Sequence, residues 1–179
     1  TRLSFESAML SVGGKTISVA DAKTTGVAKG ESLRDIGQMF NSYADVVVVR
    51  HTEQSAIAEL SEYLRIPLIN GGNGSDEHPT QALLDALTIR RAKGRLHRLN
   101  IAICGDIAHS RVARSNLILL GKMENRLRLI APPTLMPSGV EDFGCELFDD
   151  MREGLKGADV VMMLRLQKER MDGGFIPSE

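Results

Sequence analysis

The sequence is poor in cysteine, lacks any long apolar run and carries almost no net charge, and each absence excludes a class of protein. Its two cysteines, Cys104 and Cys145, lack metal-ligand spacing, and Cys104 closes an apolar run, so we predict reduced core residues and no disulfide framework. With 22 basic and 23 acidic side chains, no overall field attracts nucleic acid or an anionic membrane. No apolar run approaches the roughly 20 residues that span a bilayer, and residues 1–6 do not resemble a signal peptide, so we expect a cytoplasmic protein.

Several familiar catalytic motifs are also absent. No Gly-x-Gly-x-x-Gly follows a predicted strand, and the sequence contains no Walker A motif, no His-Glu-x-x-His and no Gly-x-Ser-x-Gly. We therefore expect no cofactor and no metal ion, and a chemistry that depends on positioning and electrostatics.

Short β-rich apolar runs alternate with amphipathic stretches along the chain, which is typical of βαβ units and parallel sheets. Basic residues followed by Gly94 indicate the end of one helix, and a second series of elements begins after it. We therefore predict an α/β protein with two lobes, residues 1–93 and 94–179, hinged by the helix that starts at Pro79. The predicted strands are Thr16–Ala20, Val46–Val49, Pro67–Ile69, Ile101–Cys104, Leu127–Ala131, Glu146–Phe148 and Val160–Leu164. The predicted helical faces carry Leu33, Ile36, Phe40 and Tyr43, and Ile57, Leu60 and Leu64.

Polar side chains follow the carboxyl ends of four predicted strands, where ligands bind in open parallel α/β sheets. They are Arg50 with His51, Asn70 with the glycine-rich loop 71–77, Gly105 through Arg111, and Arg165 through Gln167. The three arginines are suited to carboxylates and phosphates, because a planar guanidinium donates paired hydrogen bonds. Any one of them could instead be a solvated loop residue in a weak surface pair. Their joint placement favours a site for polyanionic substrates.

The segment His78-Pro79-Thr80-Gln81 places an imidazole at the start of a helix. Pro79 suits the first helical position, so His78 is predicted to be the N-cap. Backbone N–H groups and the helix dipole favour negative charge there, so an anion or a polarised carbonyl oxygen would be stabilised beside His78. Taken alone, the tetrapeptide equally fits a histidine that merely caps a helix after a polar loop.

Together these residues resemble the catalytic chain of the aspartate transcarbamoylases, over essentially the whole sequence. His78-Pro79-Thr80-Gln81 is typical of transcarbamoylases, and the segment from Arg165 to Arg170 resembles the aspartate-binding loop rather than its counterpart in ornithine enzymes. The motifs that carry the resemblance are Thr1 to Glu6, Lys29 to Glu31, Val49 to His51, His78 to Gln81, Gly105-Asp106 with Arg111, and Arg165 to Arg170.

The resemblance implies two Rossmann-like lobes, each with a parallel sheet flanked by helices, and a transfer of the carbamoyl group from carbamoyl phosphate to the α-amino group of L-aspartate. This reaction yields N-carbamoyl-L-aspartate and phosphate in pyrimidine biosynthesis. The resemblance assigns the carbonyl oxygen and phosphate of carbamoyl phosphate to Thr1, Arg50 and His78, and its amide nitrogen to Gln81. It assigns the two carboxylates of aspartate to Arg111, Arg165 and Gln167.

By the same resemblance, Thr25 and Lys29 would reach the site of a neighbouring subunit. This implies a homotrimer, and the sequence leaves open whether regulatory or dihydroorotase chains bind to it. Taken by itself, Lys29 is a weak candidate, because its loop of small residues fits an exposed turn equally well.

The ends of the chain depart from the family pattern. The family's phosphate loop reads Ser-Thr-Arg-Thr, of which Thr1 alone is represented, and the rest of the aspartate lobe would lie beyond Glu179. We therefore expect a fragment that is a poor or inactive catalyst by itself. Two alternatives stay open, namely an inactive homologue that serves as a structural partner and a transcarbamoylase with another amino acceptor.

Overall fold

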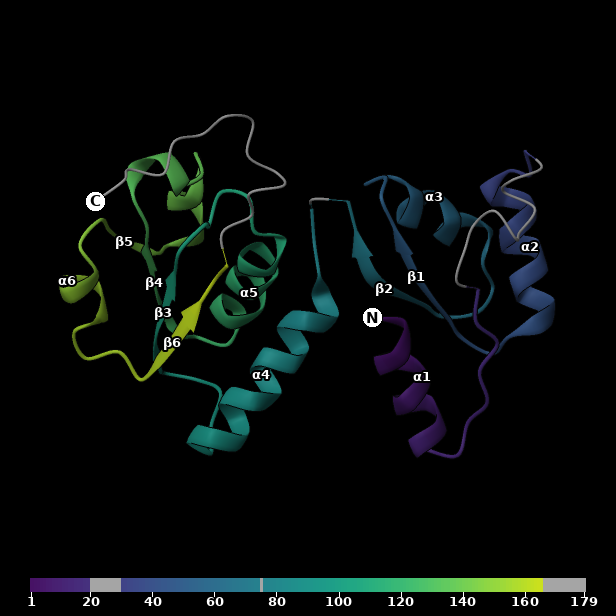
Figure 1. Ribbon diagram of the computed structural model, residues 1–179, viewed down its shortest axis with the longest axis horizontal. Helices are drawn as coiled ribbons and strands as arrows, with labels where there is room; N and C mark the ends of the chain where they lie inside the picture. Colours follow the sequence, from purple (N-terminus) through teal and green to yellow (C-terminus); the bar gives the residue numbers. More distant parts are fainter. Residues whose placement is uncertain (20–29, 75, 166–179) are drawn as a thin grey trace. The chain divides into compact units, whose positions relative to one another are not determined.

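The computed structural model describes residues 1–19, 30–74 and 76–165. The chain divides into two compact units, Thr1–Gly74 and Ser75–Glu179, and each contains a parallel β-sheet (Figure 1). The prediction of an α/β protein with parallel sheets flanked by helices is confirmed.

The first unit is built on two paired parallel strands, β1 (Val47–His51) and β2 (Leu68–Asn73). Both strands extend beyond their predicted ends, because backbone pairing continues through a bulge after Val49 until His51 lies opposite Asn73. The helices of this unit are α1 (Arg2–Ser11), α2 (Leu33–Tyr43) and α3 (Ala56–Tyr63).

The start of α2 is fixed by a capping box. The Ser32 hydroxyl accepts a hydrogen bond from the backbone N–H of Asp35 at 3.2 Å, and the Asp35 carboxylate accepts one from the Ser32 backbone N–H at 3.3 Å. Ile36, on the predicted apolar face, is buried. Beside it, Gly37 allows a close approach to α3, since a Cβ there would lie 3.0 Å from Cβ of Tyr63.

The predicted strand Thr16–Ala20 is wrong over its described part, residues 16–19, which pair with no strand. Ile17 is 84% exposed and Val19 is 54% exposed, so these β-branched residues have no sheet face to pack on. β propensity reflects packing against neighbouring strands, and none of the described strands pairs with these residues.

The described residues of the second unit form a four-stranded parallel sheet with the order β5-β4-β3-β6. Its strands are β3 (Asn100–Cys104), β4 (Arg126–Ile130), β5 (Glu146–Phe148) and β6 (Val160–Met163), all within one residue of the predicted bounds. The helices are α4 (Pro79–Lys93), α5 (Arg111–Lys122) and α6 (Met151–Leu155), with short 3₁₀ turns η3 (Pro133–Leu135) and η4 (Val140–Phe143).

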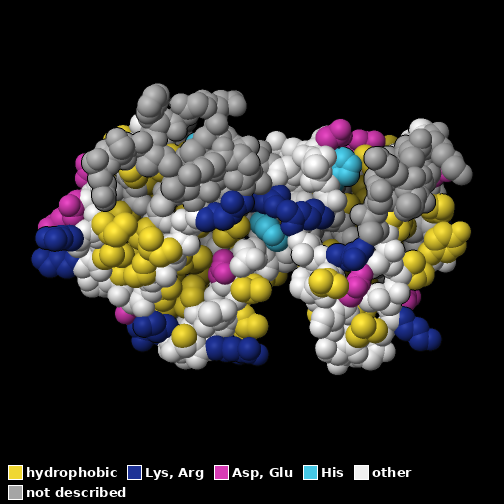
Figure 2. Space-filling view, in the orientation of Figure 1, with side chains coloured by type: hydrophobic (Ala, Val, Ile, Leu, Met, Phe, Trp, Pro, Cys, Tyr) yellow, Lys and Arg dark blue, Asp and Glu magenta, His cyan; other side chains and the backbone are white. Residues whose placement is uncertain are grey.

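The core of the second unit has two sides because the central strand β3 is buried on both faces. Ile101 and Ile103 pack with residues of α4 and α5, whereas Ala102 and Cys104 pack on the side of Leu155 in α6. α6 is short, and Figure 2 shows apolar side chains at the surface of this unit. The exposed large apolar residues of β5, α6 and β6 are Leu147, Met151, Val161 and Met163.

The helix α4 lies beside α5 (Figure 1) and contributes Ala86 and Ile89 to the larger core cluster. This packing places α4 in the second compact unit, although the sequence assigned it to the first lobe. The boundary at residues 93 and 94 stays a prediction for the protein as a whole.

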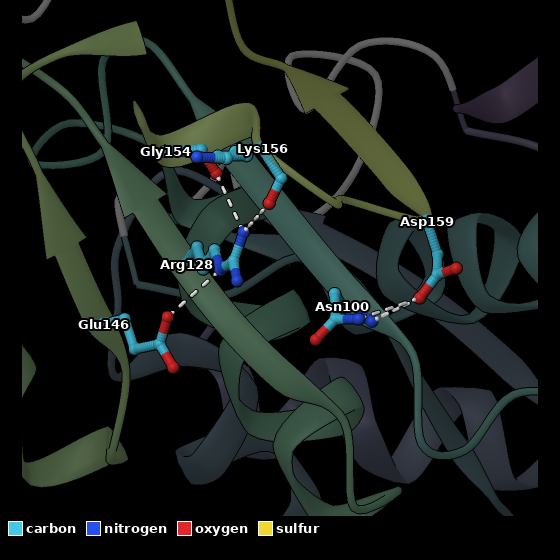
Figure 3. Close-up of polar contacts among 6 residues, drawn as sticks. All are labelled: Asn100, Arg128, Glu146, Gly154, Lys156 and Asp159. Atoms are coloured by element: carbon cyan, nitrogen blue, oxygen red, sulfur yellow. Dashed lines mark hydrogen bonds and ion pairs between the residues drawn. The ribbon is translucent and has the colours of Figure 1, made fainter. Parts of the chain in front are cut away.

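Two polar clusters tie the strands of the second unit to their connections (Figure 3). Arg128 donates from Nε to Glu146 at 3.1 Å and from Nη1 to the carbonyl oxygens of Gly154 and Lys156. Asp159 accepts hydrogen bonds from the backbone N–H of Asn100 at 2.8 Å and from its side-chain amide at 3.2 Å. The hydrogen bond from the Asn100 backbone is the main cause that holds the pKa of Asp159 below its ordinary value.

Candidate active site

Thr1 and Arg50 lie together in the first unit. Nη1 of Arg50 donates a hydrogen bond to Oγ1 of Thr1 at 2.6 Å. On the neighbouring strand, Gly71 lies beside this pair, and a Cβ there would be in ordinary contact with Cγ2 of Thr1 at 3.5 Å and closer to the carbonyl oxygen of Val49, at 3.2 Å. The structure therefore brings together the two residues of this unit that the resemblance assigned to carbamoyl phosphate, and Arg50 belongs to β1 itself rather than to a loop after it.

The glycine-rich segment after Asn70 begins as a buried strand end, which corrects the predicted polar loop at residues 71–73. Oδ1 of Asn70 accepts from the backbone N–H of Gly72 at 2.8 Å, and its Nδ2 donates to Oδ1 of Asn73 at 3.0 Å. Asn73 in turn donates to the carbonyl oxygen of Gln54 at 3.1 Å. These bonds order the strand end before the chain leaves the first unit.

His78 is the N-cap of α4, as predicted. Its carbonyl oxygen accepts from the backbone N–H of Gln81 at 3.0 Å, and its own backbone N–H donates to Oγ of Ser115 at 2.9 Å. Ser115 is buried in α5, so α5 holds the start of α4 in place. His78 is half-buried, next to the first turn of a helix that Pro79 begins. Such a position favours an anion or a developing oxyanion, since the first backbone N–H groups of a helix point towards it.

The side chain of Gln81 is held from within its own helix. Nε2 of Gln81 donates to Oδ1 of Asp85 at 3.0 Å, and Oδ2 of Asp85 accepts from Nδ2 of Asn116 at 2.8 Å. Asn116 is fully buried in α5. A chain of hydrogen bonds therefore runs from the core of the second unit to the first turn of α4.

Two predicted strand ends come close together in the second unit. The backbone N–H of Leu164 donates to the carbonyl oxygen of Cys104 at 2.8 Å, so β3 and β6 end side by side. Gly105, at φ +114°, is required at this point, because a Cβ there would lie 2.8 Å from the carbonyl oxygen of Leu164. Arg165 follows directly, and its place beyond β6 fits the predicted ligand edge.

The loop between β3 and α5 carries a buried carboxylate. Asp106 is fully buried, and its Oδ1 lies 2.8 Å from Nδ1 of His109 and accepts from the His109 backbone N–H at 3.2 Å. Ser110 caps α5 by accepting from the backbone N–H of Ala113 at 3.2 Å. Arg111 is the first residue of α5, so it lies at the helix end that follows the carboxyl end of β3.

The sequence prediction covered some of these residues and missed others. Thr25, Lys29 and Gln167 lie outside the described residues. The roles of Asp85, Asn116 and Ser115 were missed. One signal was available, because residues four apart on a helix face each other and Gln81 and Asp85 have that spacing.

Across residues 1–19, 30–74 and 76–165, no group of three or more His, Cys, Asp or Glu side chains could hold a metal ion. In the same part of the chain, no helix combines the length and the apolar character that crossing a bilayer requires.

The fold and these strand ends define a two-unit α/β protein with arginine side chains at or after the carboxyl ends of its parallel strands. Residues 1–91 match the model of the carbamoyl-phosphate-binding domain of aspartate/ornithine carbamoyltransferases. The chain belongs to the aspartate/ornithine carbamoyltransferase family.

The similar proteins are of the aspartate type. The chain is 65% identical to the aspartate carbamoyltransferase catalytic subunit of Paracoccus denitrificans and 62% identical to that of Ruegeria pomeroyi, in each case over 100% of this chain. It covers 56% and 58% of those relatives, so it spans little more than half their length.

Two solved structures that resemble this chain are also aspartate transcarbamoylases. The Trypanosoma cruzi aspartate transcarbamoylase in complex with carbamoyl phosphate superposes with a TM-score of 0.87 at 36% identity, over 97% of this chain and 58% of that one. The catalytic subunit of the M. jannaschii aspartate transcarbamoylase gives a TM-score of 0.85 at 38% identity, over 94% of this chain and 58% of that one.

Proposed function

We propose that the protein is an aspartate carbamoyltransferase, which transfers the carbamoyl group of carbamoyl phosphate to the α-amino group of L-aspartate in pyrimidine biosynthesis. The observation that carries this proposal is the position of Arg111 and Arg165, which follow the adjacent parallel strands β3 and β6. Two guanidinium groups at one sheet edge suit a dicarboxylate acceptor, whereas ornithine would bring a cationic side chain to them. The similarity to aspartate-type catalytic subunits supports the same choice.

The proposed roles follow from the charge that develops during the reaction. The neutral α-amine attacks the carbamoyl carbon, a C–N bond forms, and negative charge builds on the carbonyl oxygen. His78 and Arg50, with Thr1, donate to that oxygen and to the phosphate. Collapse of the intermediate breaks the bond between carbon and the phosphate oxygen, and the departing phosphate takes the amine proton. His78 is therefore a donor and not the general base.

The remaining residues bind and position the substrates. Gln81 accepts from the amide of carbamoyl phosphate, while Arg111, Arg165 and Gln167 bind the aspartate carboxylates. Holding both substrates in attack geometry contributes on the order of 7–11 kcal/mol in favourable cases. Thr25 and Lys29 serve the site of a neighbouring subunit, so the proposal includes a cytoplasmic homotrimer that regulatory or dihydroorotase chains could join. No cofactor and no metal ion take part.

An assay of carbamoyl-aspartate formation tests this function. The coding sequence for these 179 residues, together with the coding sequence that flanks it in its genome, is expressed and supplied with carbamoyl phosphate and L-aspartate or L-ornithine. We expect product from aspartate and none from ornithine. Product from ornithine would refute the choice of acceptor, and binding of carbamoyl phosphate without any product would indicate the inactive homologue.

A further inference from the structure

The amide of Gln81 has one orientation, which is set by the buried end of its hydrogen-bond network. In α5, Nδ2 of Asn116 donates both to the carbonyl oxygen of Val112 at 3.1 Å and to Oδ2 of Asp85 at 2.8 Å. A backbone carbonyl and a carboxylate only accept hydrogen bonds, so the amide nitrogen of Asn116 must face them. The core of the second unit therefore fixes Asp85.

The fixed carboxylate determines which atom Gln81 presents. Because Asp85 can only accept, the Gln81 group next to it must be the donor, Nε2, at 3.0 Å. The carbonyl oxygen, Oε1, then points away from Asp85. Among the described residues, no group donates a hydrogen bond to this Oε1.

We propose that Asp85 is a positioning residue for carbamoyl phosphate, because it makes Gln81 present an acceptor to the amide N–H of that substrate. This inference rests on the proposed function. Asp85 touches no substrate; it acts through Gln81. The network then selects a phosphorylated carbamoyl group over an acyl group of the same shape that has no N–H to donate.

The polarity of the network gives a sharp expectation for Asp85→Asn. Oδ1 of the new amide must accept from Asn116, so its Nδ2 turns towards Gln81. Gln81 then rotates to accept that hydrogen bond and presents Nε2, a donor, to the substrate amide. Two donors then face each other, so the preference for an amide ligand should disappear.

A second change should restore the original polarity. In Gln81→Glu combined with Asp85→Asn, one carboxylate oxygen of residue 81 accepts from the new amide and the other faces the ligand as an acceptor. The summed charge of the two positions is unchanged. Moving the negative charge from residue 85 to residue 81 changes the affinity of two phosphonate ligands of equal charge by the same factor. The ratio of their two affinities therefore does not depend on this move.

Calorimetry with two phosphonates measures this ratio in the full-length protein described for the activity assay. Phosphonoacetamide carries the amide, and 2-oxopropylphosphonate has a methyl group in its place. For the unsubstituted protein we expect the amide to bind about tenfold more tightly. Asp85→Asn should abolish the preference, and Gln81→Glu with Asp85→Asn should recover most of it. Asp85→Ala leaves Gln81 able to rotate either way, so it should reduce the preference severalfold. Because alanine has a high helix propensity, this second variant should keep α4 helical.

Asp159→Asn is the matched control, since it changes a hydrogen-bonded carboxylate at the opposite, amino-terminal end of β6. It should leave the ratio unchanged even where it lowers stability. An unchanged ratio in both Asp85 variants, or a double variant no better than Asp85→Asn, would overturn the role of Asp85. Failure of the unsubstituted protein to bind either phosphonate would instead count against the proposed function.

Discussion

Replacing Gly105 with alanine should destabilise the second unit more than an ordinary glycine substitution, and it should also disturb the part of the site where we propose that aspartate binds. Gly105 has a φ of +114° and lies at the carboxyl end of β3. A Cβ there would lie 2.8 Å from the carbonyl oxygen of Leu164, a backbone atom that cannot rotate away. Because Arg165 is the next residue along the chain, any movement of Leu164 displaces it too.

Two costs add to give the expected magnitude. A non-glycine residue held in a sparsely populated backbone region costs about 1–3 kcal/mol. Forcing an extra carbon into packed structure costs a further 1–3 kcal/mol, roughly. We therefore expect Gly105→Ala to lower the free energy of unfolding by about 3 kcal/mol, in the lower half of the summed range of about 2–6 kcal/mol.

Urea unfolding tests this magnitude. With a denaturant slope of about 1–3 kcal/mol/M, the loss lowers the urea midpoint by about 1–3 M. Gly94→Ala is the matched control, because Gly94 ends α4 at φ +72° with nothing within 4 Å of the added Cβ, so it carries only a conformational cost of about 1–2 kcal/mol. Equal destabilisation by the two substitutions would refute the reasoning from the close approach.

Three other predictions concern ionisable side chains. Because the folded state lowers the pKa of Asp159, its ionised carboxylate stabilises the fold above about pH 4, and this stabilisation is lost as the pH falls through the folded pKa. In Asp159→Asn, the free energy of unfolding should therefore depend less on pH in that window, as acid unfolding would measure. His78→Ala should lower kcat about 100-fold or more and change the KM for aspartate little, as steady-state kinetics would measure; a raised KM with unchanged kcat would contradict this. Arg165→Ala should raise the KM for aspartate about tenfold or more, and an unchanged aspartate response would remove it from the site.

Hydrophobic pattern predicted the central strand of the second sheet well, because β3 is buried on both faces and reads as a continuous apolar run. Ile101 to Cys104 is such a run, and β3 differs from it by one residue. Pattern failed at residues 16–19, where equally β-prone side chains have no described partner strand. It also missed the lengthening of β2 through two glycines, because register with β1 and not propensity keeps residues 71–73 in the strand.

In the candidate site as well, local sequence predicts some features, whereas others depend on contacts between residues far apart in the chain. Local chemistry reveals His78, because Pro79 and the helix that follows define an N-cap from the sequence alone. The contact between Gln81 and Asp85 could be anticipated in part, since residues four apart are neighbours on a helix. The spacing does not reveal which way the amide points, because the direction depends on Asn116, which lies 31 residues beyond Asp85 on another helix. Donor and acceptor polarity is a property of the whole network, so only a structure that places α4 against α5 can show that Gln81 turns its donor to Asp85 and keeps its acceptor for the proposed substrate amide.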